Sequence, residues 1–199
     1  MVINFDEVGS KTLSPAKLAH VVLRTQQDNF ARMVSFYKTF LGAHASHEDE
    51  KLSFITYDDE HHRIAIAALP GIGPRDPKAC GLEHISFTFN SLEDLLFAYR
   101  QRRAHDILPV WCVNHGVTVS IYYRDPDGNQ IETQVDVFET PELANAFMDS
   151  PENEENPIGV DFDPEDLIQK LQSGVSAKEL LKRPNIGPRG FDTVPLLKP

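Results

Sequence analysis

The same order of elements, a strand, a helix and three more strands, is predicted twice along this chain. The first copy opens on β-branched residues at 18–25, which favour a strand, and continues with apolar residues at helical spacing over 29–42. The second copy opens in the same way at 81–90, and its helix, 91–106, has Ser91 as its N-cap. Each helix is followed by three apolar runs that predict strands, at 43–48, 52–57 and 62–69 in the first copy and at 107–113, 117–124 and 129–138 in the second.

Two tandem βαβββ units predict an α+β domain in which the strands form one curved mixed sheet or open barrel. The units span about 16–69 and 80–138, and a loop rich in proline and glycine separates them. Together they make up a domain at 15–138, which follows an N-terminal arm at 1–14. The rest of the chain, 139–199, is expected to be a C-terminal extension of short helices and an arm, without further strands.

The C-terminal extension carries clear helix signals after an acidic segment at 148–157, which is expected to be a solvated linker. Asp163 followed by proline starts one helix, and a capping box of Ser176 and Glu179 starts another. Neither helix is long enough to be stable alone, so both are expected to dock on the domain or on a partner subunit.

Charge and composition exclude several classes of partner. Acidic residues total 30 against 19 basic ones, a formal net charge of −11, so the phosphate backbone of a nucleic acid would be repelled. No stretch approaches the ~20 apolar residues that span a bilayer, and the first residues lack the features of a signal peptide. Cys80 and Cys112 lack CxxC spacing and are expected to be core residues in a reducing compartment. A cytoplasmic protein is therefore expected, with neither nucleic-acid nor membrane binding.

Alternation along the predicted strands places a set of polar side chains on one face. His84 lies opposite the apolar residues of its strand, Tyr122 and Glu132 lie on the corresponding face of theirs, and His20 takes the place in the first unit that His84 takes in the second. A curved sheet with its polar side concave would collect these four side chains. Two histidines and one carboxylate are the ligands of a non-haem Fe(II) site with open positions, although a histidine is also commonly a hydrogen-bonded structural residue.

Several segments together resemble one protein family. The similarity lies in LAHVVLRT with FYKTFLG, in HHRIAIAALP, in GLEHISF and in YYRDPDGNQIE, over about residues 15–136. These segments are similar to the catalytic half of type I extradiol ring-cleavage dioxygenases, of the 2,3-dihydroxybiphenyl and catechol dioxygenase kind, in the vicinal oxygen chelate superfamily. The classical enzymes carry an additional metal-free pair of units, so this chain is expected to be either a single-module form or a relative with a changed reaction. The residues retained around the site favour the single-module form. A homodimer partner or the helices after Pro157 would complete its cleft.

The resemblance implies a role for each candidate residue. His20, His84 and Glu132 fall on the metal ligands, with Fe(II) as the metal and Mn(II) as the alternative. His62 falls on the active-site base, and Tyr122 falls on the tyrosine that hydrogen-bonds a catechol oxygen. His115 lies near the place of one more polar residue beside the substrate and is a third catalytic candidate. The implied reaction cleaves the ring of a small aromatic diol beside its two hydroxyl groups, incorporates both atoms of O2 and gives a muconic semialdehyde-type product.

Other polar and aromatic residues near these motifs have simpler expectations. His61 should face solvent and point away from His62, which should pack, because adjacent residues of a strand face opposite sides. Tyr123 is expected to pack in the core, while Trp111 could line the substrate pocket or fill the core. The remaining histidines are expected at the surface, namely His44, His47 and His105.

Two other functions fit the same fold, and fold alone does not choose among them. A glyoxalase I or epimerase-like isomerase or lyase uses a fourth metal ligand, commonly a glutamate in the first unit, and the last predicted strand of that unit, 62–69, offers no carboxylate. A metal-free protein that binds an antibiotic or another small molecule has no need for two histidines and a glutamate at one point. Both arguments favour the dioxygenase, expected to work as a homodimer.

Overall fold

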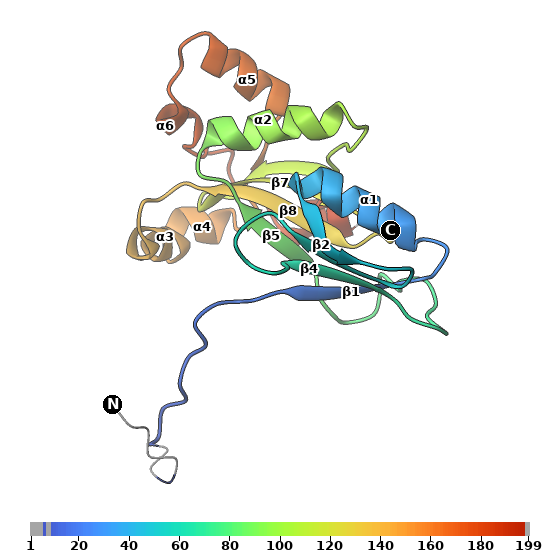
Figure 1. Ribbon diagram of the computed structural model, residues 1–199. Coiled ribbons are helices and arrows are strands. Elements are labelled where there is room, and N and C mark those ends of the chain that lie inside the picture. The colour runs from blue at the N-terminus through green and yellow to red at the C-terminus, as the bar shows by residue number, and fades with distance from the viewer. Residues whose placement is uncertain (1–5, 7–8, 198–199) are drawn as a thin grey trace.

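The first unit folds as its sequence pattern predicts, with one helix packed on a four-stranded sheet (Figure 1). The computed structural model describes residue 6 and residues 9–197. The elements are β1 Val21–Thr25, α1 Phe30–Leu41, β2 His44–Glu48, β3 Leu52–Thr56 and β4 Ile64–Ala68. They form a sheet in the order β1-β4-β3-β2, with β1 and β4 parallel. All five residues of β4 are buried, because this strand lies between two others and under α1.

The second unit repeats this arrangement and gains an additional strand. Its elements are β5 His84–Thr88, α2 Leu92–Arg103, β6 Trp111–Asn114, β7 Thr118–Arg124 and β8 Gln130–Asp136. A two-residue strand from the C-terminal extension, β9 Val160–Asp161, pairs with β6 and completes the order β5-β8-β7-β6-β9. The predicted N-cap of α2 is confirmed, since the Ser91 hydroxyl accepts a hydrogen bond from the Asp94 N–H at 3.0 Å.

The turn between β7 and β8 both sets the register of the hairpin and joins the two units. Asp125 accepts hydrogen bonds from the N–H groups of Asp127 and Asn129, and Gly128 takes a φ of +82°. The other carboxylate oxygen of Asp125 accepts a hydrogen bond from the hydroxyl of Tyr37 on α1, at 3.0 Å. The turn therefore holds the first unit against the second.

The predicted α+β fold of two βαβββ units is confirmed, with a difference in how the strands connect. The strands of the described residues form two hydrogen-bonded sheets, whereas the sequence pattern suggests one curved sheet. The units meet through side chains instead of a backbone ladder. Arg102 of α2 donates a hydrogen bond to the Phe40 carbonyl near the end of α1, at 2.9 Å, and the Phe40 ring packs edge-on against Tyr123. Tyr123 is fully buried, as predicted.

The C-terminal extension is more ordered than its sequence indicates. Its elements are α3 Pro141–Met148, α4 Pro151–Glu155, β9, α5 Pro164–Gln172, α6 Ala177–Leu180, η1 Phe191–Thr193 and η2 Pro195–Leu197. The expected linker at 148–157 contains α4, because Ser150 caps a helix that begins with proline. The prediction that no further strand follows is wrong, since β9 forms by pairing with the exposed edge of β6. No helix in the described part of the chain is long and apolar enough to cross a membrane.

The two predicted C-terminal helices do form, and α5 docks on its own chain. Asp163 and Ser176 cap α5 and α6 as expected. Leu167 and Ile168 of α5 are buried in the main core, and Glu165 forms ion pairs with arginines of α2. The alternative of docking on a partner subunit is not needed for α5.

The two cysteines differ from the prediction that both are core residues. Cys112 is partly buried in β6, but Cys80 is exposed. Cys80 lies in the proline- and glycine-rich loop between the units, which runs over the surface, so no core surrounds it.

Candidate metal centre

A histidine and a glutamate meet at the edge of the second sheet. β5 and β8 are parallel neighbours, so His84 at the start of β5 lies diagonally across from Glu132 of β8. The Nε2 atom of His84 is 3.1 Å from Oε2 of Glu132. Glu132 is only 5% exposed, whereas the side chain of His84 keeps about a third of its surface open to solvent, at 34%. This pair thus presents nitrogen and oxygen donors that are partly open to solvent through His84.

The carboxylate of Glu132 is held in its ionised form. Burial raises its pKa, but hydrogen bonds from His84, Ser120, Ser86 and Tyr122 outweigh this and lower the pKa to about 2. The same hydrogen bond between His84 and Glu132 raises the pKa of the imidazole. A buried carboxylate that stays negative beside an imidazole nitrogen is suited to bind a cation.

Tyr122 and His115 extend this pair along the neighbouring strand. Tyr122 lies directly opposite Glu132 in the β7–β8 ladder, and its hydroxyl donates a hydrogen bond to Oε1 of the glutamate at 3.0 Å. The phenol oxygen is also 3.1 Å from Nε2 of His115. On the other side of that ring, Nδ1 is 2.6 Å from the carbonyl oxygen of Ile158. A carbonyl only accepts, so Nδ1 carries the hydrogen and, in the neutral ring, Nε2 faces Tyr122 as an acceptor.

Burial sets the protonation of these two side chains. It lowers the pKa of His115, mainly by desolvation, so the imidazole is favoured in its neutral form. It raises the pKa of Tyr122, and the nearby charge of Glu132 raises it further. Tyr122 is therefore a protonated hydrogen-bond donor at neutral pH.

His20 and His62 form a second group, on the first unit. β1 and β4 run parallel, so the residues just before them, His20 and His62, lie at the same end of the sheet. Their ring centroids are 4.2 Å apart. His62 is 6% exposed and stacks on Phe54, with 4.5 Å between centroids. Desolvation, followed by the nearby His20 and His61, lowers the pKa of His62 and favours a neutral ring that can accept a proton.

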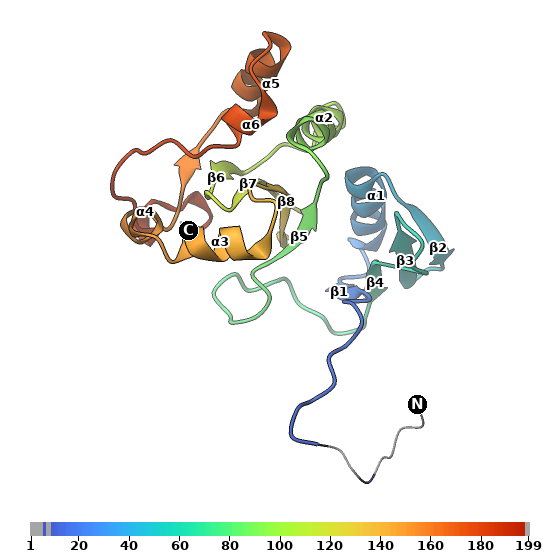
Figure 2. The same cartoon turned by 90° about the vertical axis from the view of Figure 1, so that its left-hand side faces the viewer.

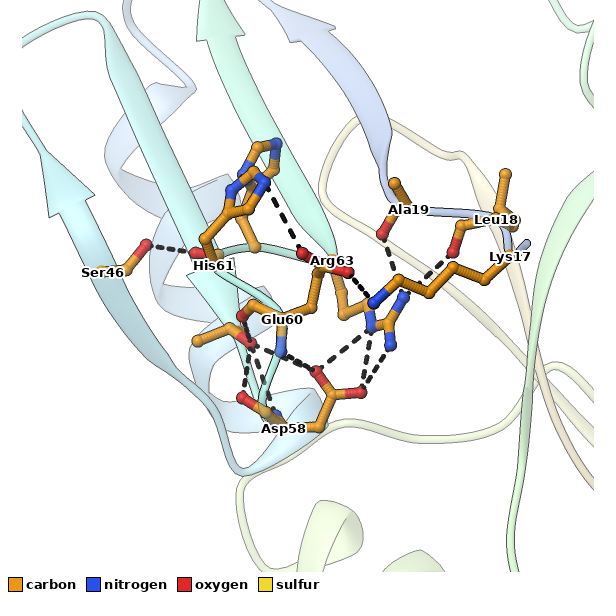
Figure 3. A network of polar contacts seen from close by, with 10 residues as sticks. Lys17, Leu18, Ala19, Ser46, Asp58, Glu60, His61 and Arg63 are labelled. Atoms are coloured by element: carbon orange, nitrogen blue, oxygen red, sulfur yellow. Dashed lines mark hydrogen bonds and ion pairs between the residues drawn. The ribbon is translucent and has the colours of Figure 1, made fainter. Parts of the chain in front are cut away.

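A polar network around Arg63 holds the backbone next to both histidines (Figure 3). The guanidinium of Arg63 donates to the carboxylate of Asp58 and to the carbonyls of Leu18 and Ala19, at 3.0 and 3.1 Å for the two carbonyls. These carbonyls belong to the segment that leads directly into His20. Arg63 therefore fixes the positions of two predicted site residues relative to each other.

The expected separation of His61 and His62 is wrong. Their Nδ1 atoms lie 2.5 Å apart, so both rings are on the same side of the chain. The reason is that β4 begins only at Ile64, so the two histidines precede the strand and its alternation does not apply to them. The expectation that His61 faces solvent while His62 packs is confirmed, since 70% of the His61 side-chain surface is open and His62 is buried. His44, His47 and His105 are exposed as predicted.

The structure brings together two of the three predicted metal ligands. His84 and Glu132 are in contact, while His20 lies with His62 on the other unit. Among the described residues, no three His, Cys, Asp or Glu side chains are close enough together to hold a metal ion. The donor types nevertheless fit Fe(II), since imidazole nitrogens and one ionised, buried carboxylate are available.

Sequence reasoning left the role of Trp111 open and missed Ile158 and Asp161, which also support this site. Trp111 stacks on Tyr122 with 5.1 Å between ring centroids, and its indole N–H donates to Asp161 at 2.8 Å. Its position opposite Tyr122 could have been read by pairing the predicted strands 107–113 and 117–124 as antiparallel neighbours. The contacts of Ile158 and Asp161 could not, because they depend on how the C-terminal extension folds back.

Comparisons with known proteins agree with this architecture. Residues 17–133 match the model of the Glyoxalase/Bleomycin resistance protein/Dioxygenase superfamily. The chain is 46% identical over 159 residues to biphenyl-2,3-diol 1,2-dioxygenase 2 of Rhodococcus globerulus, covering 79% of this chain and 83% of the relative. It is 44% identical over 174 residues to biphenyl-2,3-diol 1,2-dioxygenase 3 of the same organism, covering 86% and 90%.

A solved structure supports the fold. A glyoxalase/dioxygenase from Nostoc punctiforme superposes with a TM-score of 0.52 at 20% identity, covering 64% of this chain and 98% of that one. The predicted resemblance to extradiol dioxygenases is confirmed by the two curated relatives. The chain therefore belongs to the Glyoxalase/Bleomycin resistance protein/Dioxygenase superfamily and, within it, to the extradiol dioxygenases.

Proposed function

We propose that this enzyme cleaves the ring of a small catechol-type diol beside its two hydroxyl groups and incorporates both atoms of O2. Biphenyl-2,3-diol, the compound in the names of the two relatives, is the first candidate substrate. The observation that carries the proposal is the connected array of His84, Glu132, Tyr122 and His115, with Glu132 and Tyr122 buried, in a chain with such relatives. The product would be of the muconic semialdehyde type.

We propose Fe(II) as the metal, with Mn(II) as the alternative, held by His84 and Glu132 together with His20. When bound, it would supply open positions for the diol and for O2. Glu132 is suited to this role because it is ionised and buried, and His84 is suited because its Nε2 atom already points at the same carboxylate. Binding of the metal by all three residues requires His20 to approach the side chains of His84 and Glu132.

The proposed catalytic residues each hold or move a proton at a defined atom. His62 would donate its Nδ1 hydrogen to Nδ1 of His61, which lies 2.5 Å away, and would accept a proton from the diol at Nε2. Tyr122, kept protonated by burial, would donate its hydroxyl hydrogen to a substrate oxygen and stabilise negative charge there. His115, kept neutral by burial, would orient Tyr122 through Nε2 and contact the substrate beside it.

Three further proposals concern the whole chain. The domain division is 1–14, 15–138 and 139–199, which is supported by the position of the eight strands β1 to β8 within the middle segment. The enzyme acts as a homodimer in the cytoplasm. A dimer is supported by residues 9–16, which leave the body as an extended arm in both views (Figures 1 and 2) and expose Leu13, while Leu18 is exposed at the base of this arm.

Anaerobic reconstitution with Fe(II), followed by a panel of catechols in air, tests the proposed reaction. We expect equal amounts of O2 consumed and yellow ring-fission product formed with at least one diol. His62→Ala should lose at least ~100-fold in kcat while the metal stays bound, since it removes the acid–base group. His47→Ala, which changes an exposed histidine, is the matched control.

Two results would contradict this proposal. Oxygen uptake with none of the diols, together with tight binding of zinc or nickel, would favour the glyoxalase-like isomerase. Loss of the metal from His62→Ala would show that His62 is a ligand, so the assignment of ligands and base would be wrong.

A further inference from the structure

The C-terminal extension places an arginine behind the candidate active site. Arg189 has only 10% of its side-chain surface exposed. Its two terminal nitrogens donate to the two carboxylate oxygens of Asp161, at 2.8 and 3.0 Å, in a bidentate pair. The same guanidinium donates to the Gly159 carbonyl at 3.0 Å and to the Thr193 hydroxyl at 2.9 Å. These contacts leave Arg189 little freedom and tie the end of the chain to residues 159–161.

One set of contacts runs from Arg189 through Asp161 to Trp111, which stacks on Tyr122. The Asp161 oxygen that Arg189 contacts at 2.8 Å also accepts the indole N–H of Trp111, at 2.8 Å. The Trp111 ring stacks on Tyr122 at an interplanar angle of 23°, and its edge meets the His115 ring, 5.5 Å away between centroids. The hydrogen bond at its N–H restricts rotation of the indole, which packs against the Tyr122 ring.

A second set of contacts leads to His115. The Asn156 side-chain oxygen accepts the N–H groups of Ile158 and Gly159, at 3.2 and 2.7 Å, which shapes the turn. Arg189 holds the Gly159 carbonyl on the next peptide. The Ile158 carbonyl, between these two anchors, accepts the Nδ1 hydrogen of His115 and so decides which nitrogen of that ring faces Tyr122.

We propose that Arg189 is a positioning residue for ring cleavage. It orients Tyr122 through Asp161 and Trp111, and it orients His115 through the turn that carries the Ile158 carbonyl. The inference rests on the proposed function, because the orientation of Tyr122 matters for catalysis only if its hydroxyl contacts the substrate. A hydrogen-bond donor that is misplaced by a fraction of an ångström stabilises charge poorly. By keeping Tyr122 in place, Arg189 makes the C-terminal extension a supporting part of the active site.

Arg189→Met tests this proposal, with Arg100→Met as the matched control. Arg100 is also in an ion pair with a carboxylate, but its side chain is 45% exposed and lies on α2. The chain has one tryptophan, so intrinsic tryptophan fluorescence comes from Trp111 alone. We expect a shift in the emission of Arg189→Met and none in Arg100→Met.

Kinetics of the Fe(II)-loaded enzyme supply the second readout. Arg189→Met should lower kcat by about 10- to 100-fold with a smaller change in KM, as is typical when the support of an active-site group is removed. In a Tyr122→Phe background, the same substitution should cost at most a few-fold, because the group that Arg189 positions is already gone. Arg189→Lys keeps a single contact to Asp161 and should lie between wild type and Arg189→Met in kcat.

Several outcomes would overturn the proposal. A kcat of Arg189→Met equal to that of Arg100→Met would do so. So would an equal loss of kcat from Arg189→Met in the wild-type and Tyr122→Phe backgrounds, because it would indicate a general structural defect. If Arg189→Met does not fold, a wild-type kcat and emission in Arg189→Lys would count against it. If the wild-type enzyme cleaves no diol, the proposed function has failed; unchanged emission of Arg189→Met would then overturn the positioning role separately.

Discussion

Replacing Gly159 with alanine should destabilise the protein far more than the same change at a second glycine of positive φ. Gly159 has a φ of +109°, and a Cβ atom there would lie 2.2 Å from the Asn114 carbonyl oxygen and 2.9 Å from the His115 Cα. Both neighbours are backbone atoms, at the end of β6 and the start of its connection to β7, so a side-chain rotation cannot relieve the clash. Gly128, with a φ of +82°, has no atom within 4 Å of such a Cβ and is the matched control.

The difference between the two variants can be estimated from these distances. Backbone strain at positive φ costs about 1–2 kcal/mol and applies to both. Overpacking against a rigid backbone adds about 1–3 kcal/mol at Gly159 only. We therefore expect a loss of about 4 kcal/mol in the free energy of unfolding for Gly159→Ala and about 1.5 kcal/mol for Gly128→Ala.

Equilibrium unfolding in urea, with the same metal content in all three proteins, measures both losses. With a slope of about 2 kcal/mol per molar urea, the midpoint should fall by about 2 M for Gly159→Ala and by less than about 1 M for Gly128→Ala. Midpoints within about 0.3 M of each other would refute the reasoning, because they would show that the β6–β7 backbone moves aside at little cost.

Three further substitutions or modifications test separate parts of the site. Arg63→Met should weaken Fe(II) binding by about tenfold in a metal titration, because the segment before His20 loses its anchor; an unchanged affinity would contradict this. Burial raises the pKa of Cys112 to about 12, so its thiol stays protonated at pH 8. Iodoacetamide should therefore label Cys80 alone at pH 8, and the rate of Cys112 labelling should rise about tenfold for each unit by which the pH is raised. Equal labelling of both cysteines at pH 8 would count against this pKa. Tyr122→Phe should lower kcat by about 100-fold with little change in the urea midpoint, and a loss below about threefold would remove Tyr122 from the mechanism.

The sequence predicts the second unit's half of the site well because local chemistry decides its geometry. The turn at 125–129 fixes the hairpin, and the hairpin register then places Tyr122 opposite Glu132. Alternation along β5 puts His84 on the same face. Each step needs only neighbours along the chain or across one strand pair.

The parts of the fold and site that the sequence does not predict depend mainly on contacts between distant segments, which leave no periodic pattern in the sequence. β9 has two residues and forms only because the edge of β6 is available to it. Its residue Asp161 then meets Trp111 and Arg189, which are 50 and 28 positions away along the chain. The error at His61 has a smaller cause, since the start of β4 was expected two residues too early.

The hydroxyl of Tyr122 shows why these distant contacts bear on chemistry. It has one hydrogen and two acceptors, Oε1 of Glu132 at 3.0 Å and Nε2 of His115 at 3.1 Å. Nε2 is an acceptor only while Nδ1 of the neutral ring gives its hydrogen to the Ile158 carbonyl. One of the two acceptors is therefore left without a full hydrogen bond, and an anionic substrate oxygen entering beside Tyr122 competes for a hydrogen that is already shared. By holding the Ile158 carbonyl in place, the C-terminal extension fixes Nε2 of His115 as one of the acceptors with which the substrate oxygen competes for that hydrogen.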